Sequence, residues 1–163
     1  MKKKVKQVET RLRTVKTYVA EETEEYIKLD HSDKVVEFMR FFIRPEELPV
    51  EKIWVFALNS KLEINNFSEV SKGARTGAMV DISEIFRLLM LSNANSFILV
   101  HNHPSGNPRP SAEDRNLTKE LTEAGELMRI KLTDHIIMGE NTYFSFQKGT
   151  INEILSKKRK ECL

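Results

Sequence analysis

The sequence predicts an α/β sandwich in which a mixed β-sheet packs against helices. Its 163 residues suit one domain, and 40% of them are hydrophobic, an ordinary fraction for a chain that builds a core. Short apolar runs typical of strands alternate with stretches of helical periodicity. The strands occur in hairpins as well as between helices, so the order differs from the regular alternation of a parallel sheet.

The first part of the chain predicts a charged segment followed by a helix. We expect residues 1–32 to be partly ordered, with one or two short strands. Ser32 is the expected N-cap of the helix, and Pro45 and Pro49 are expected to end it. Its buried face consists of apolar residues at helical spacing, namely Val35, Val36, Phe38, Met39 and Phe42.

Five runs are typical of buried or paired strands. Residues 53–58 and 62–70 are expected to form one hairpin, and residues 130–138 and 142–146 a second. Residues 96–100 are expected to form a short buried strand between two helices.

Two helices separate these strands. The first is expected to start at a capping box formed by Asp81 and Glu84, and the second at Ser111. The buried face of the second consists of Leu117, Leu121, Ala124 and Met128. A last helix is expected to start near Thr150. Residues 151–163 are expected to form either this basic helix or a basic tail.

The composition argues against several classes of protein. Cys162 is the single cysteine, which excludes an intramolecular disulfide and a cysteine-ligated zinc site and favours a reducing cytoplasm. The net charge of +2 is near neutral, and the basic residues gather at the two ends, which favours solvated ends over a nucleic-acid interface. No run approaches the roughly 20 apolar residues of a membrane span, and none follows the basic N-terminus as in a secretory signal.

The stretch from His101 to Asp114 carries the chemistry. His101 and His103 are two residues apart at the end of a strand, so their side chains point to the same side. The loop that follows can bring Asp114, in the first turn of the next helix, back to both rings. Two imidazoles and one carboxylate leave the fourth position of a tetrahedral zinc ion for water, which is the arrangement of a catalytic site.

Such a site needs two further groups. Zinc lowers the pKa of its bound water from about 15.7 toward about 7, and a nearby carboxylate can then take the proton. Ser111 could donate a hydrogen bond to the oxyanion that forms. A structural alternative exists, because Ser111 and Asp114 also have the spacing of a capping box. The joint pattern of histidines, serine and aspartate favours the metal site.

The complete pattern, His-x-His, seven residues, Ser, two residues and Asp, resembles the JAMM motif of the JAB/MPN metalloprotease superfamily. The string His-Asn-His-Pro-Ser-Gly at 101–106 is similar to RadC-type bacterial proteins, as are residues 124–127 and 134–137. The resemblance covers roughly residues 33–147.

This resemblance implies a JAB/MPN domain over residues 33–150, with a curved mixed β-sheet flanked by helices as in cytidine-deaminase-like sandwiches. It implies that His101, His103 and Asp114 bind Zn²⁺ and that Ser111 steadies a tetrahedral intermediate. We expect the short, JAB-only form without the N-terminal helix-hairpin-helix region of longer RadC proteins.

The resemblance also implies a glutamate base, for which two residues compete. Glu51 is preferred, because it precedes the strand at 53–58 where the family has a glutamate before an apolar strand. Glu84 is the rival, although Ile82 and Ser83 replace the Pro-Arg pair that precedes this glutamate in the RadC pattern.

Asp134 and His135 form a second polar pair, on the strand at 130–138. Neighbouring strand residues face opposite sides, so at most one of the two faces the zinc. That residue either orients a histidine ligand by a hydrogen bond or is a satisfied structural group.

Three functions compete. The preferred one is zinc-dependent hydrolysis of a peptide or isopeptide bond in a peptide or protein substrate. The second is a DNA-repair-associated factor or metal-dependent nuclease, for which the near-neutral charge gives little support. The third is a non-catalytic scaffold.

Overall fold

The computed structural model describes residues 27–70 and 80–154, and one mixed sheet forms its centre. The strands are β1 (Ile53–Leu58), β2 (Ile64–Glu69), β3 (Ser96–Asn102), β4 (Lys131–Met138), β5 (Thr142–Ser145) and β6 (Thr150–Glu153). The helices are α1 (Ser32–Phe42), α2 (Ile82–Leu91) and α3 (Ala112–Met128), with a short 3-10 helix, η1 (Pro45–Glu47).

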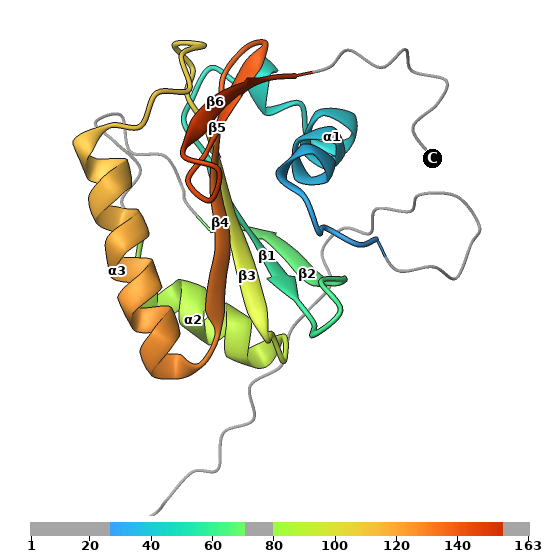
Figure 1. Cartoon of the computed structure of the whole chain (residues 1–163), viewed down its shortest axis with the longest axis vertical. Coiled ribbons are helices and arrows are strands. Elements are labelled where there is room, and N and C mark those ends of the chain that lie inside the picture. Colours follow the sequence, from blue (N-terminus) through green and yellow to red (C-terminus); the bar gives the residue numbers. More distant parts are fainter. Residues whose placement is uncertain (1–26, 71–79, 155–163) are drawn as a thin grey trace, which may run out of the picture.

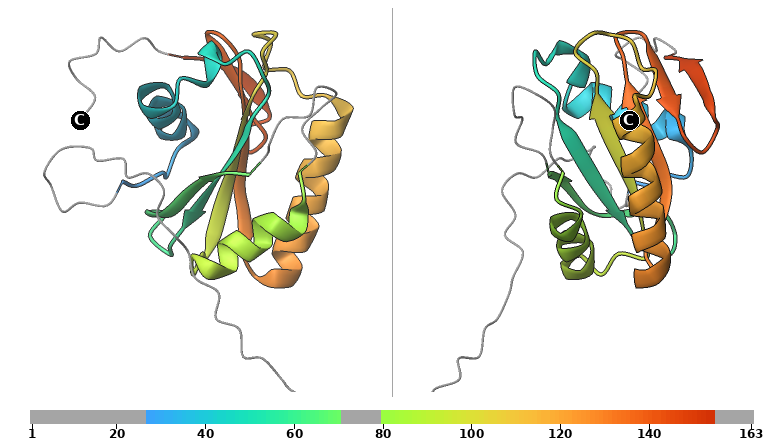
Figure 2. Two further views of the ribbon diagram at one scale, coloured as in Figure 1. Left: turned by 180° about the vertical axis from the view of Figure 1, so that it is seen from behind. Right: turned by 90° about the vertical axis from the view of Figure 1, so that its left-hand side faces the viewer.

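The strand order is β2-β1-β3-β4-β5-β6, with helices on both faces. Helix α1 covers one face, and α2 and α3 cover the other (Figure 1; Figure 2). Strands β3 and β4 are parallel and joined by α3, whereas the other neighbouring pairs are antiparallel. The predicted mixed sheet flanked by helices is therefore confirmed.

Alternating side chains of the central strands build one core on each face. On β3, Ile98 and Val100 pack in the core beneath α1, whereas Phe97 and Leu99 pack in the core beneath α2 and α3. This alternation fixes the direction of the next residues along the strand. His101 therefore faces the layer of α3.

The start of α1 differs from the prediction. His31 is the N-cap, and Ser32 lies buried in the first turn instead. The Ser32 hydroxyl donates to Asp134 Oδ2 at 2.9 Å, and the Ser145 hydroxyl donates to the same oxygen at 2.7 Å. A buried carboxylate needs such donors. This contact between α1 and the sheet therefore takes the hydroxyl that was expected to cap the helix.

The two helices on the opposite face start at side-chain caps. Asp81 accepts a hydrogen bond from the Ser83 N–H, but the Glu84 carboxylate pairs with Arg87 at 2.8 Å instead of completing the predicted capping box. Ser111 is the N-cap of α3 within a complete capping box. Among the described helices, none combines the length and apolar character that a membrane crossing requires.

The last described segment is a strand, so the helix predicted to start near Thr150 is wrong. Strand β6 pairs with β5 from Thr150 opposite Ser145 to Glu153 opposite Thr142. Pairing with an existing sheet edge satisfies backbone groups that a short isolated helix would satisfy poorly. Residues 1–26 of the charged segment and the tail from residue 155 lie outside the described residues.

Candidate metal centre

The candidate site lies where β3 ends and α3 begins. His101 is the last residue of β3 that faces the α3 side of the sheet, and Asp114 lies in the first turn of α3. The loop between them is held by the β4–β5 turn. A Cβ on Gly139 would lie 2.3 Å from the Gly106 carbonyl oxygen, so only glycine permits this approach. The His103 N–H also donates to the Met138 carbonyl at 2.9 Å. The loop therefore brings the start of α3, with Asp114, back to the end of β3.

Four donor groups converge there. One ligand atom from each of Glu51, His101, His103 and Asp114 lies within 4.8 Å of the others. The Nε2 atoms of His101 and His103 are 3.1 Å apart. His101 Nε2 lies 3.0 Å from Asp114 Oδ1, and His103 Nε2 lies 3.4 Å from Asp114 Oδ2. This group could hold a metal ion.

These distances fit a small tetrahedral cation. Metal–nitrogen and metal–oxygen bonds of about 2.0–2.1 Å at tetrahedral angles place neighbouring ligand atoms about 3.3 Å apart. The three separations among His101, His103 and Asp114 are 3.0, 3.1 and 3.4 Å. A nitrogen and carboxylate donor set is also one that zinc accepts.

Asp114 serves both as a helix cap and as a member of the cluster. Its Oδ2 accepts from the Ser111 N–H at 2.7 Å, and its own N–H donates to Ser111 Oγ at 3.0 Å. Burial raises the pKa of the Asp114 carboxyl, but the hydrogen bonds that His101 and His103 donate when their rings are protonated outweigh it and hold that pKa well below its usual range. The capping and metal alternatives are thus compatible, because the cap orients the carboxylate toward the histidines.

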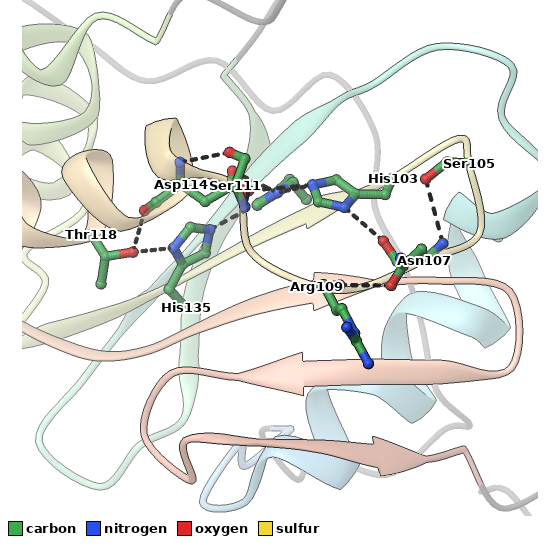
Figure 3. Close-up of polar contacts among 9 residues, drawn as sticks. His103, Ser105, Asn107, Arg109, Ser111, Asp114, Thr118 and His135 are labelled. Carbon is green, nitrogen blue, oxygen red and sulfur yellow. Dashed lines mark hydrogen bonds and ion pairs between the residues drawn. The ribbon is translucent and has the colours of Figure 1, made fainter.

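His103 presents its ring nitrogen from the solvent side of the cluster. Its Nδ1 lies 2.8 Å from the Asn107 carbonyl oxygen, an acceptor, so Nδ1 carries the proton and Nε2 is left free to bind a metal ion (Figure 3). The side chain is 16% exposed, compared with 1% for His101. The hydrogen bond with Asp114 raises the pKa of His103 despite partial burial, and the charge of Glu51 contributes.

This raised pKa predicts how stability depends on pH. In metal-free protein, the His103 contribution is full below its ordinary pKa of about 6.5 and is lost as the pH rises through the raised value. Zinc requires the neutral ring and is expected to reverse the trend. Thermal unfolding followed across this pH range, with chelator or with zinc, checks both directions. In chelator, His103→Gln is expected to remove the loss of stability at rising pH. If the variant loses stability as the wild type does, a group other than His103 causes the loss.

Asn102 holds the segment that carries Glu51. Its Oδ1 accepts from the Lys52 N–H at 2.8 Å, and its Nδ2 donates to the Val50 carbonyl at 3.1 Å. These bonds fix the backbone on both sides of Glu51, and Asn102 itself is buried. The side chain between the two histidines therefore sets the distance between the Glu51 backbone and the strand that carries the rings.

Asn102→Ala is expected to lower the free energy of unfolding by about 1–3 kcal/mol, because the Val50 and Lys52 backbone groups lose their partner. Urea denaturation measures this loss. Asn152→Ala is the control, since within the described residues the Asn152 side-chain amide bonds only to the nearby Thr150 carbonyl, and it should cost no more than about 0.5 kcal/mol. Equal effects of the two substitutions would contradict the proposed restraint.

The other predicted site residues occupy distinct places. Ser111 Oγ accepts the Asp114 N–H at the edge of the cluster, and its hydroxyl keeps a proton to donate. Glu84 lies in an exposed pair with Arg87, outside the cluster. Asp134 faces Ser32 on the α1 side of the sheet, whereas His135 Nε2 lies 2.8 Å from His101 Nδ1 on the other side.

Two residues near the cluster were given no role from the sequence. Thr118 lies one turn after Asp114 on α3, and its Oγ1 is 2.7 Å from His135 Nδ1 (Figure 3). Asn102 is the middle residue of the His-x-His string. The helical spacing of Asp114 and Thr118 places them on one face and was the available signal for Thr118. No comparable signal identified Asn102, because its partners lie about 50 residues away.

A mixed sheet between helices, with His-x-His at a strand end and an acid in the next helix, defines a potential metal-binding domain of the JAB/MPN class. The family model of the RadC-like JAB domain matches residues 29–151, and the chain belongs to this family.

Curated relatives agree with this assignment. A UPF0758 protein of Clostridium botulinum is 43% identical over 124 residues, which is 76% of this chain and 52% of that protein. A UPF0758 protein of Thermotoga maritima is 36% identical over 121 residues, 74% of this chain and 53% of that protein. A UPF0758 protein of Flavobacterium johnsoniae is 41% identical over 100 residues, which is 61% of this chain and 44% of that protein. The chain thus spans about half the length of the curated relatives it matches.

Proposed function

We propose that this chain is a zinc-dependent hydrolase that cuts a peptide or isopeptide bond. The convergence of His101, His103 and Asp114 at 3.0–3.4 Å, with the Glu51 carboxylate in the same cluster, carries the proposal. Three protein ligands leave a zinc ion one open position, which is the arrangement of catalytic rather than structural zinc.

The bound ion would supply Lewis acidity and lower the pKa of a coordinated water toward about 7. Each residue then has a separate task. The Glu51 carboxylate accepts the proton of the attacking water and returns it to the leaving amine. The Ser111 hydroxyl, whose oxygen already accepts the Asp114 N–H, donates its proton as a hydrogen bond to the developing oxyanion.

The access to the cluster suits a large substrate. His101 and Asp114 are buried, while the more exposed His103 and the half-buried Glu51 form the solvent side. We propose that a backbone or isopeptide amide approaches the cluster from that side. A peptide or protein is therefore the proposed substrate class.

Elemental analysis of protein purified without chelator or affinity nickel tests the metal, with about one zinc per chain expected. Cleavage of a library of peptides and isopeptide-linked conjugates, with and without chelator, then tests the reaction. Zinc binding without cleavage would favour a scaffold, and salt-sensitive DNA binding or cleavage would favour the nucleic-acid role. A wild-type chain that takes up no zinc, even after zinc is added back, would refute the proposal.

A further inference from the structure

We propose that His135 and Thr118 are positioning residues that fix the tautomer of His101, so that its Nε2 lone pair faces the metal site. The inference rests on the metal-binding part of the proposed function and is independent of hydrolysis. It arises from a chain of hydrogen bonds between the start of α3 and the end of β3 (Figure 3).

The direction of the first bonds follows from counting protons. Thr118 Oγ1 lies 2.6 Å from the carbonyl oxygen of Asp114, which can only accept, so the hydroxyl donates its single proton there. Oγ1 must then accept the proton of His135 Nδ1, which is 2.7 Å away. The proton of neutral His135 therefore lies on Nδ1.

The same counting continues to the metal cluster. With Nδ1 of His135 protonated, its Nε2 is an acceptor, and His101 Nδ1 at 2.8 Å must donate to it. In the neutral His101 ring, Nε2 then keeps its lone pair. This is the atom that lies 3.0 Å from Asp114 Oδ1 and 3.1 Å from His103 Nε2. A proton on that nitrogen would exclude it as a ligand.

The surroundings leave the hydrogen-bonded rings of His101 and His135 little freedom to rotate or to exchange partners. His101 and His135 are both fully buried, so water does not replace a lost partner. Phe146 stacks on the His135 ring with a centroid separation of 4.8 Å and an angle of 6° between planes, which restricts its rotation. Metal-ligating histidines generally donate their second N–H to an acceptor that orients them, and here a second histidine supplies that acceptor.

Nitrogen NMR tests the tautomers directly. In histidine-labelled wild-type protein, long-range proton–nitrogen correlations are expected to show a proton on Nδ1 of both His101 and His135 and no proton on Nε2 of His135. Protonation of His135 on Nε2, or on both nitrogens, would overturn the inference. The measurement does not need zinc, so it decides the inference even if the wild-type chain binds no metal and the proposed function fails.

Zinc affinity, measured by competition with a chromogenic chelator, tests the consequence. Thr118→Val keeps the branched shape but removes the acceptor of the His135 proton, and it is expected to weaken zinc binding about 10- to 100-fold. Thr118→Ser restores the hydroxyl and should restore the affinity.

Thr122→Val is the matched control. Thr122 lies one turn further along α3, and its hydroxyl donates to the Thr118 carbonyl at 2.7 Å, as the Thr118 hydroxyl does to Asp114. The control should bind zinc like the wild type. Equal weakening by the two valine substitutions, or no rescue by serine in a folded variant, would assign the effect to helix stability and reject the positioning role.

Discussion

Asp114→Asn is expected to remove zinc from the protein while leaving helix α3 intact. The substitution keeps an oxygen that can accept from the Ser111 N–H at the helix start, but it removes the negative charge that faces His101 and His103. Losing a ligand should cost more than the about 10- to 100-fold that the loss of an outer partner costs. Elemental analysis should therefore find about one zinc per wild-type chain and little in the variant.

Glu113→Gln is the control for this experiment. Glu113 lies in the same first turn of α3 and is exposed, so its loss changes the charge near the helix N-terminus without touching the cluster. The control should retain zinc. An Asp114→Asn variant that keeps a full complement of zinc would show that the carboxylate is a helix cap only.

The helix α3 and its cap illustrate what the sequence specifies well. Ser111 and Asp114 have local capping-box spacing, and the structure forms both hydrogen bonds of the box. His101 and His103 are two residues apart on a strand, so alternation alone places them on one side. Local spacing therefore predicted three of the four clustered residues. The fourth, Glu51, came only from a family resemblance, because nothing in its local pattern marks it.

The errors came from contacts between distant parts of the chain. Ser32 has the right type and place for an N-cap, yet its hydroxyl donates to Asp134, which is 102 residues away. Residues near Thr150 were expected to be helical, but an available edge of β5 pairs with them instead. In both cases a tertiary partner supplies the hydrogen bond that the local pattern assigned elsewhere.

The place of His135 shows a different limit of prediction from the sequence. Strand alternation implies that Asp134 and His135 face opposite sides, but it does not say which of them meets the site. The parallel pairing of β3 with β4 decides this, because it places His135 opposite Leu99 on the face covered by α3. When a long helix joins two strands, the cores packed on both faces of the sheet set their register. The sequence of a single strand does not reveal how these cores pack.

Glu51→Gln is expected to slow hydrolysis strongly while leaving zinc in place. A glutamine has nearly the same shape but cannot take a proton from the attacking water, and loss of a general base lowers the rate about 100- to 10,000-fold. Glu84→Gln is the matched control, because Glu84 pairs with Arg87 on the exposed side of α2. The cleavage rate, measured on a substrate found in the library, and the zinc content should both be unchanged in this control.

The zinc content of Glu51→Gln also decides what kind of site this is. The Glu51 carboxylate lies close enough to the histidine and aspartate donors to be a fourth ligand, and a zinc ion with four protein ligands is closed and structural. If Glu51 is instead a base, the ion keeps three protein ligands and the variant retains its zinc. Retained zinc with lost activity therefore supports an open catalytic site. Lost zinc would make Glu51 a ligand, and the domain would then be a metal-stabilised scaffold, in which Asn102 holds Glu51 close to the histidines for coordination.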